Sequence, residues 1–393
     1  TRRSSAASGS RPTRRWTSSW RSSRRSPAAS SRRWSGSGRG PSSGARARIV
    51  TPARGSDRVH PLPKRSGCEA FLKPCPLPRC PVRNAARPVV SVGNVAAGGT
   101  GKTPFVRWLA GELSKRGHSP AILTRGYGRK SRGTVVVSDG RGTVASVSAS
   151  GDEPALLARA LPSVPIVADA RRVRAAARAE TLEAPVGVHL LDDGFSHVGL
   201  ARDVDIVLLD ATDPAAGGAL LPAGLLREPL SALARADLIV VTKTEQSDPA
   251  AALELAGLHA PGVPVFRART EVLGIRDREG RPVDPADLPA GTTVAVAGIA
   301  RPGSFLSTLS SIGVSPAELL SFRDHEAYGP VTAGRIERAL EETGATAVVT
   351  TEKDAVKLEA VLSVPIFRVA VEARVVEAAF VSEVLSLLSR RPS

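Results

Sequence analysis

Short runs of apolar and β-branched residues recur from Pro88 onward, separated by longer stretches in which apolar residues return every three or four positions. The short runs end in glycine, threonine or charged residues, which is typical of strands buried in a parallel sheet. They predict strands at 89–92, 121–124, 164–167, 186–191, 205–209, 238–242, 293–297, 347–351 and 364–369. The longer stretches predict helices at 105–113, 151–161, 171–182, 305–312 and 331–343, and an amphipathic helix near the C-terminus.

Strands that alternate with helices predict an α/β fold with a doubly wound, mainly parallel sheet. Two short alternating runs, 134–137 and 143–147, flank Asp139-Gly140 and predict a hairpin. The segment 244–290 is rich in Ala, Pro and Gly and has weak periodicity, so it is interpreted as a linker. The expected domains are a core at 88–243 and a smaller C-terminal α/β lobe at 291–393.

Residues 1–87 form a leader without apolar periodicity, rich in Arg, Ser and Pro, and we expect it to be disordered. The net charge of +17 belongs to it: residues 1–88 hold 21 of the 54 basic residues but 2 of the 37 acidic ones. Three explanations stay open, namely a tail for nucleic acid or phospholipid, a targeting segment, and translated sequence foreign to the mature protein. The third is favoured because the chain starts with Thr and contains no Met.

The cysteines and the apolar runs exclude two classes of protein. All three cysteines, Cys68, Cys75 and Cys80, lie in the leader with no strong zinc spacing, so the body has no disulfide framework. No run approaches the roughly 18 apolar residues of a membrane-spanning helix. The near-neutral body and its few aromatic residues argue against nucleic-acid binding.

The strongest motif is PVVSVGNVAAGGTGKT at 88–103, in which a short strand, a Gly-rich turn and a helix-compatible run follow one another. This order predicts the phosphate-binding loop of a P-loop NTPase-like domain. Lys102 would reach the β- and γ-phosphates, and the Thr103 hydroxyl would bind Mg²⁺. The usual first glycine is replaced by Ala96. The predicted nucleotide-binding residues are Ala96, Ala97, Gly98, Gly99, Thr100, Gly101, Lys102 and Thr103.

Acidic residues follow two of the predicted strands or begin a helix. Asp192 and Asp193 end a buried run, where a P-loop enzyme holds its Mg²⁺, although a pair of turn carboxylates would look the same. Asp152 and Glu153 begin a helix, where a carboxylate accepts a proton, binds metal-bound water or only caps the helix. His325, next to Asp324, is a candidate to orient a carboxylate, or a surface histidine.

Two further polar runs lie at strand ends. Arg125, Tyr127 and Arg129 occupy a Gly-rich turn, where they either contact an anionic substrate or form an ordinary exposed loop. The run 350–354, Thr-Thr-Glu-Lys-Asp, is interpreted as the capped start of a helix.

Taken together, these motifs resemble the tetraacyldisaccharide 4′-kinase family, also called lipid A 4′-kinases. The resemblance covers nearly all of the chain after Pro88, and several separate motifs occur in the family's order. The matching segments are VSVGNVAAGGTGKTP (90–104), LTRGYGRK (123–130), GDEP (151–154), DDGFSHVGLARDVDIVLLD (192–210), LLPAGLLREP (220–229), FRDHEAYG (322–329) and TEKDAVKL (351–358).

The resemblance implies phosphoryl transfer from ATP to the 4′-hydroxyl of a tetraacyldisaccharide 1-phosphate, giving the 1,4′-bisphosphate precursor of lipid A. It implies Asp152 as the base, paired with His325, and Lys102 among the catalytic residues. Glu153, Asp192, Asp193 and Thr103 would surround Mg²⁺, and Tyr127, with Arg125, would contact the substrate. The expected partners are the lipid disaccharide and, peripherally, the cytoplasmic face of the inner membrane.

The chain departs from the family at two places. Ser196 stands where members usually have Gln, so a contact by that Gln is lost. Members usually begin with a membrane-seating helix before the first strand, whereas here the segment is interrupted by prolines. The alternative functions are another P-loop NTPase or a GTPase-like switch. For the switch, Lys243 would belong to a guanine-reading motif, but Glu245 replaces the expected Asp.

Overall fold

The computed structural model describes residues 82–288, 291–299, 302–323 and 326–390. The described residues all belong to one unit that runs from Pro76 to Ser393. Its strands join in a single mixed sheet, in the order β11-β10-β12-β13-β8-β7-β6-β1-β5-β2-β4-β3, with β9 beside β8. Most neighbouring pairs are parallel, which confirms the predicted α/β class with a mainly parallel sheet.

The N-terminal half of the sheet is centred on β1 (Val89–Gly93), between β5 (Val188–Asp192) and β6 (Val204–Asp210). Beyond them lie β2 (Pro120–Thr124), β4 (Pro165–Ala168) and β7 (Leu238–Thr242). The helices of this half are α1 (Lys102–Lys115), α2 (Val147–Ser150), α3 (Asp152–Ala160), α4 (Arg172–Ala179) and α5 (Ala250–His259).

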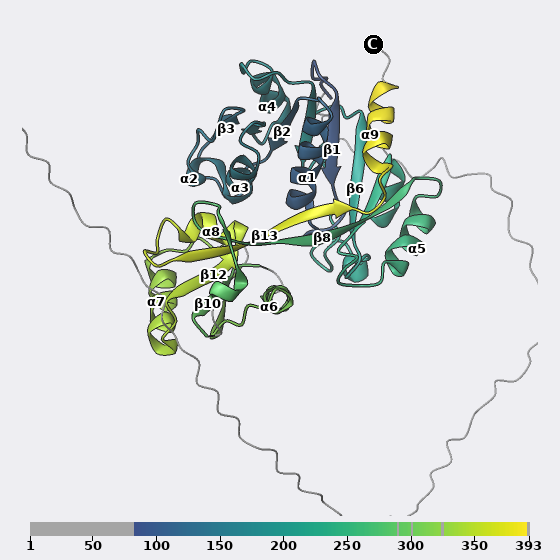
Figure 1. Ribbon diagram of the computed structural model, residues 1–393. Helices are drawn as coiled ribbons and strands as arrows, with labels where there is room; N and C mark the ends of the chain where they lie inside the picture. The colour runs from purple at the N-terminus through teal and green to yellow at the C-terminus, as the bar shows by residue number, and fades with distance from the viewer. Residues whose placement is uncertain (1–81, 289–290, 300–301, 324–325, 391–393) are drawn as a thin grey trace, which may run out of the picture. The chain divides into compact units, whose positions relative to one another are not determined.

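Helix α1 packs its apolar face on this sheet. Phe105, Leu109 and Leu113 are fully buried in a cluster that includes apolar side chains of β1 and β5. The last helix, α9 (Phe380–Ser389), returns to the same cluster, and Phe380 meets Phe105 edge to face at 5.7 Å between ring centres. The C-terminal helix thus completes the core around the helix that follows the Gly-rich loop (Figure 1).

The C-terminal half contains β10 (Thr293–Ala297), β11 (Glu318–Ser321) and β12 (Ala347–Thr351), all parallel, with α6 (Pro302–Ser311), α7 (Pro330–Thr343) and α8 (Glu352–Leu358). Two long antiparallel strands, β8 (Val265–Arg276) and β13 (Ile366–Val375), join it to the first half. The polar run at 350–354 is a capped helix start as predicted, because the Thr351 hydroxyl accepts the N–H of Asp354.

One local prediction was wrong, and one segment holds more regular structure than expected. The run 134–137 forms β3 (Val135–Asp139), but its antiparallel partner is β4, and Thr143 makes only an isolated bridge to Ser138. The expected linker at 244–290 holds α5, β8, β9 (Pro282–Val283) and a 3₁₀ turn, Pro285–Asp287. Strand β8 pairs with β7 first and with β13 afterwards. Most of its side chains are half-buried or exposed, so no apolar alternation marks it in the sequence. The division into domains remains a prediction.

No helix among the described residues is both long enough and apolar enough to cross a membrane. Residues 1–81, most of the predicted leader, lie outside the described part of the chain. The short stretch before β1 is anchored, since the Ala86 N–H donates to Glu180 at 3.1 Å and Arg83 bridges Leu200.

Candidate active site

Strands β1, β2, β5, β6 and β7 run parallel, so their carboxyl ends meet at one edge of the sheet. This is the edge at which open α/β sheets bind ligands. The Gly-rich loop follows β1 here, and Asp192 and Asp210 end β5 and β6. The residues predicted from separate motifs are therefore brought to one place by the topology.

Hydrogen bonds at Thr100 anchor the Gly-rich loop after β1, and its glycines face open space. The Thr100 hydroxyl accepts from the Asn94 amide at 3.0 Å, and its carbonyl accepts from the Thr242 hydroxyl at 2.9 Å. Gly98 and Gly101 have φ of 117° and 84°, and a Cβ there would meet open space. No side chain caps the start of α1. Its free N–H groups and positive dipole end suit a phosphate.

Lys102, the first residue of α1, points toward acidic and amide oxygens. Its ammonium donates to Asn94 Oδ1 at 3.2 Å and lies 3.6 Å from Asp193 Oδ1. Asp193 is also bound by Arg227 at 2.9 Å. Burial acts to raise the pKa of Asp193, but Lys102, Arg227 and then Arg172 outweigh it and hold the pKa below its usual value. Asp193 is therefore ionised and fixed beside the phosphate loop.

The neighbouring carboxyl group, Asp192, has the opposite electrostatics. It is buried, accepts from the Thr124 hydroxyl at 3.2 Å, and has Arg172 against its backbone carbonyl at 3.3 Å. Burial, followed by the negative charges of Glu153 and Asp193, raises the pKa of Asp192 to about 7. An added cation at this place would remove the repulsion that raises this pKa.

Asp152 and Glu153 begin α3 next to the turn that carries Tyr127. Gly151 precedes them with φ of 94°, and a Cβ on it would lie 2.6 Å from the Tyr127 carbonyl oxygen. Only glycine allows this approach, so the GDEP and RGYG motifs are joined through backbone contact. The Asp152 carboxylate, through Oδ2, lies 3.1 Å from the ammonium of Lys357 on α8.

In the turn after β2, Arg129 holds the backbone, whereas Arg125 and Tyr127 are exposed. Arg129 donates to the carbonyl oxygens of Ala168 at 3.0 Å and Gly133 at 2.6 Å, so it fixes the turn. Arg125 and Tyr127 are exposed, with 65% of Tyr127 accessible. Ser196, where the family usually has Gln, is exposed and donates to Glu228 at 2.6 Å.

Some predicted residues are not placed, and some placed residues were not predicted. Asp324 and His325 lie outside the described residues. Asn94, Arg227 and Lys357 contact predicted site residues, yet the sequence assigned no role to them. Arg227 and Lys357 belong to segments that carry the family resemblance, which was the one signal available for them.

The acidic residues suit a magnesium ion held together with phosphates better than a preformed metal cage. Among the described residues, no group of three or more His, Cys, Asp or Glu side chains is placed to hold a metal ion. Mg²⁺ in kinase sites needs only one or two carboxylates, with waters and substrate phosphates completing its shell. Asp192, buried at the end of β5 with a pKa raised by burial and then by neighbouring negative charges, is a candidate for such a ligand.

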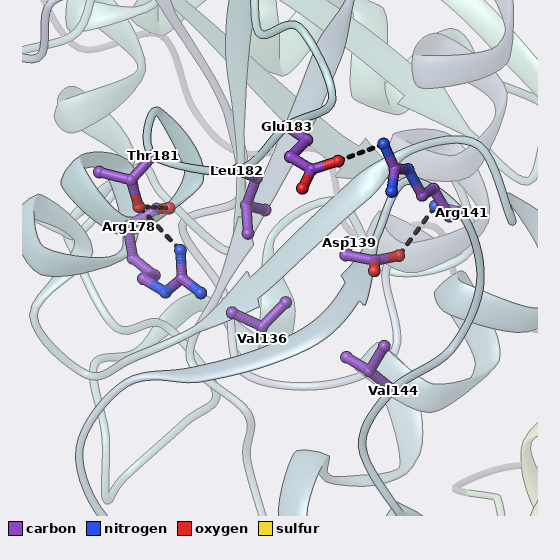
Figure 2. A pocket seen from close by; sticks show the side chains of 8 residues that line it. All are labelled: Val136, Asp139, Arg141, Val144, Arg178, Thr181, Leu182 and Glu183. Carbon is purple, nitrogen blue, oxygen red and sulfur yellow. Dashed lines mark hydrogen bonds and ion pairs between the residues drawn. The ribbon is translucent and has the colours of Figure 1, made fainter.

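A hollow of about 380 Å³ lies elsewhere (Figure 2). It is lined by β3 and the turn after it and by the end of α4, including Val136, Asp139 and Leu182, and Arg141 there pairs with Glu183. None of its lining residues belongs to the site at the sheet edge, so this hollow is separate from that site.

Comparison with known proteins identifies the family. The family model described as tetraacyldisaccharide-1-P 4′-kinase matches residues 79–389. The tetraacyldisaccharide 4′-kinase of Anaeromyxobacter sp. (strain Fw109-5) is 42% identical over 277 residues, 70% of this chain and 74% of that protein. The one from Geobacter metallireducens is 42% identical over 284 residues, 72% and 82% of the two chains.

A solved structure agrees with the sequence comparisons. A crystal structure of LpxK from Aquifex aeolicus in complex with ATP is 32% identical, with a TM-score of 0.64, and the match covers 78% of this chain and 90% of that one. The agreement of sequence and structure confirms the resemblance seen in the motifs. The chain belongs to the tetraacyldisaccharide-1-P 4′-kinase family.

Proposed function

We propose that the edge described above transfers the γ-phosphoryl group of ATP to the 4′-hydroxyl of a tetraacyldisaccharide 1-phosphate, the kinase step of lipid A biosynthesis that defines the family. The observation that carries the residue assignments is that motifs far apart in sequence are linked by contacts. Lys102 pairs with Asp193, Asp193 with Arg227, and Asp152 with Lys357.

The phosphate loop positions the donor. Backbone N–H groups of the Gly-rich turn and the uncapped start of α1 hold the phosphate oxygens, and Lys102 neutralises charge on the β- and γ-phosphates. Lys102 is 13% exposed in its side chain, and two oxygens already orient its ammonium toward the loop. Little rotamer freedom is then lost when ATP binds.

Asp152 is the proposed base. A sugar hydroxyl is a weak nucleophile, and a carboxylate at hydrogen-bond distance accepts its proton as the phosphoryl group is transferred. We assign His325, which lies outside the described residues, the role of orienting this carboxylate. Thr103, Glu153, Asp192 and Asp193 are the proposed surroundings of Mg²⁺, which when bound neutralises negative charge on the phosphates.

The acceptor reaches this edge from a lipid surface. Arg125 and Tyr127, both exposed on the turn next to Asp152, are the proposed contacts for the disaccharide 1-phosphate. Leu220, Leu221 and Leu225 are about half exposed, on the loop that also carries Arg227. We place this loop against the cytoplasmic face of the inner membrane, because exposed apolar side chains beside a lipid-using site favour insertion among acyl chains.

The experiment that tests the function is transfer of radiolabelled phosphate from ATP to tetraacyldisaccharide 1-phosphate in detergent with Mg²⁺. Lys102→Ala is expected to abolish labelled lipid. Asp152→Asn is expected to lower turnover by at least about 10²-fold with little change in ATP binding, because the base acts in the transfer step. The matched control is Asp248→Asn, which also removes a carboxylate at a helix start, where it accepts the N–H of Ala250 in α5.

The outcomes separate the possible functions. ATP hydrolysis without labelled lipid would point to a different P-loop NTPase. Normal turnover of Asp152→Asn would remove Asp152 from the role of base. Equal losses in Asp152→Asn and Asp248→Asn would show that the substitution acts through helix stability instead.

A further inference from the structure

The side chain of Lys357 is buried, yet the reaction above gives it no role. Only 8% of it is exposed, and a buried ammonium is costly unless it is paired. Its nitrogen lies 3.1 Å from Asp152 Oδ2 and 3.6 Å from Asp354 Oδ1, and it donates to the Glu326 carbonyl at 2.7 Å. It also lies 5.0 Å from the centre of the Tyr328 ring, within the range of a cation–π contact.

Three of these four partners belong to the C-terminal half. Asp354 is fully buried, and its Oδ2 accepts from the Gly298 N–H at 2.9 Å and the Thr351 hydroxyl at 2.8 Å. This leaves Oδ1 directed at the ammonium. Three groups outside α3 therefore help to set the position of Lys357.

Asp152 is the partner that comes from the other half, at the start of α3. An ammonium at Oδ2 restricts rotation of the carboxylate and so fixes the direction of its other oxygen. Glu326, which holds Lys357 through its carbonyl, follows His325 directly in the chain. The lysine thus connects the proposed base to the segment that bears its proposed partner.

We propose that Lys357 is a positioning residue that orients the Asp152 carboxylate for proton acceptance. The inference rests on the proposed function, in which Asp152 is the base. In phosphoryl transfer most of the rate comes from positioning and charge neutralisation, and a misplacement of about 1 Å costs roughly 10²-fold. A fixed carboxylate is accordingly worth more here than a strongly basic one.

A purely mechanical explanation competes with this one, in which Lys357 only joins α3 to α8. The structure offers a matched control for it. Arg159, also on α3, pairs at 2.7 Å with Glu359, the residue directly after α8. This pair joins the same two elements without touching Asp152. Loss of Arg159 should reproduce any effect that is only mechanical.

The test is a double-mutant cycle on the full chain with the phosphate-transfer assay, using Lys357→Met, Asp152→Asn and the two together. We expect Lys357→Met to lower kcat about 10²-fold while KM for ATP changes less than about twofold. In the Asp152→Asn background the same change should cost almost nothing, because residues that act through one another are not additive. Arg159→Met should stay within about threefold of wild type.

Lys357→Met leaves buried Asp354 without its cation and could therefore unfold the protein. A second variant that keeps the charge is tested for this reason. Lys357→Arg keeps the positive charge but replaces the compact ammonium by a planar guanidinium. We expect a fall in kcat smaller than that of Lys357→Met, and no fall when Asp152→Asn is also present. If Lys357→Met lowered kcat by the same factor with Asp152 and with Asp152→Asn, or if Arg159→Met lowered kcat as much as Lys357→Met, Lys357 would have no positioning role. Either result would leave Asp152 as the proposed base. Full turnover of Asp152→Asn by itself would remove the base and, with it, this inference.

Discussion

Asp192 and Asp193 are adjacent in the chain and have opposite electrostatics. Asp193 faces Lys102 and Arg227, which lower its pKa, whereas Asp192 is buried near other carboxylates and its pKa is raised to about 7. The sequence shows two identical residues after a strand. Only the fold shows that cations keep Asp193 ionised, whereas burial and neighbouring carboxylates favour the protonated form of Asp192.

The raised pKa of Asp192 predicts a pH dependence of stability. Between about pH 4 and pH 7 the unfolded chain loses this proton while the folded protein keeps it, so the stability contributed by Asp192 falls as pH rises, by up to about 4 kcal/mol in total. Asp192→Asn removes this dependence. The variant's free energy of unfolding minus that of wild type, from urea titrations in EDTA, should therefore be larger at pH 8 than at pH 5, which means that the variant gains stability relative to wild type as pH rises.

Asp210→Asn is the control for that measurement. Burial acts to raise the pKa of Asp210, but hydrogen bonds from Lys243 and Thr212 outweigh it and lower the pKa, so its contribution to stability is complete above the unfolded value near 4 and is lost only as pH falls below it. The effect of Asp210→Asn should therefore be the same at pH 5 and pH 8. A constant difference for Asp192→Asn as well would show that Asp192 ionises normally.

At the scale of elements, α1 is tied to the C-terminal half by a buried ion pair. Arg107 on α1 pairs with Glu352 at 3.1 Å, with side chains 11% and 14% exposed, and it also donates to the Val371 carbonyl. Arg107→Met leaves Glu352 buried without a cation and should cost about 3 kcal/mol in unfolding free energy, measured with urea. Exposed Arg281 pairs with Asp277, and Arg281→Met should cost less than about 1 kcal/mol.

The Arg107 prediction has its own internal check. Removing both charges, as Arg107→Met with Glu352→Gln, should recover much of the loss, since the penalty comes from the unpaired carboxylate. Equal costs for Arg107→Met and Arg281→Met would mean that the buried pair is solvated like a surface pair.

The elements that were predicted correctly are those marked by a local pattern of apolar residues. Buried parallel strands such as 89–92 and 238–242 are continuous apolar runs with an end signal of their own, and the structure contains them as β1 and β7. Strand β8 has no such run, because most of its side chains are half-buried or exposed. In the site, Lys102 was found from spacing, whereas its contact with Asn94 and the pairing of Lys357 with Asp152 depend on the folded chain.

At the scale of the whole molecule, the excess positive charge and the exposed leucines of the 220–225 loop lie in different parts of the chain. The positive charge is concentrated in the first 88 residues. The loop of Leu220, Leu221 and Leu225, by contrast, belongs to the described body, and its backbone holds it against the phosphate loop, where the Ala97 N–H donates to the Leu225 carbonyl at 2.7 Å. Membrane contact by this loop should therefore depend on acyl chains and little on salt.

This predicts the behaviour of a triple variant in which the three leucines become serine. The full chain would be sedimented with phosphatidylcholine vesicles at high salt, which screens the leader's charge. In wild type the exposed half of each leucine side chain would become buried in the membrane. Burial of a whole leucine side chain contributes about 1.5–3 kcal/mol, so the triple variant should bind vesicles at least about tenfold more weakly. Activity on acceptor in vesicles should fall more than activity in detergent. Serine at the exposed Leu253 and Leu258 of α5 is the matched control, and equal losses there would place the membrane contact elsewhere.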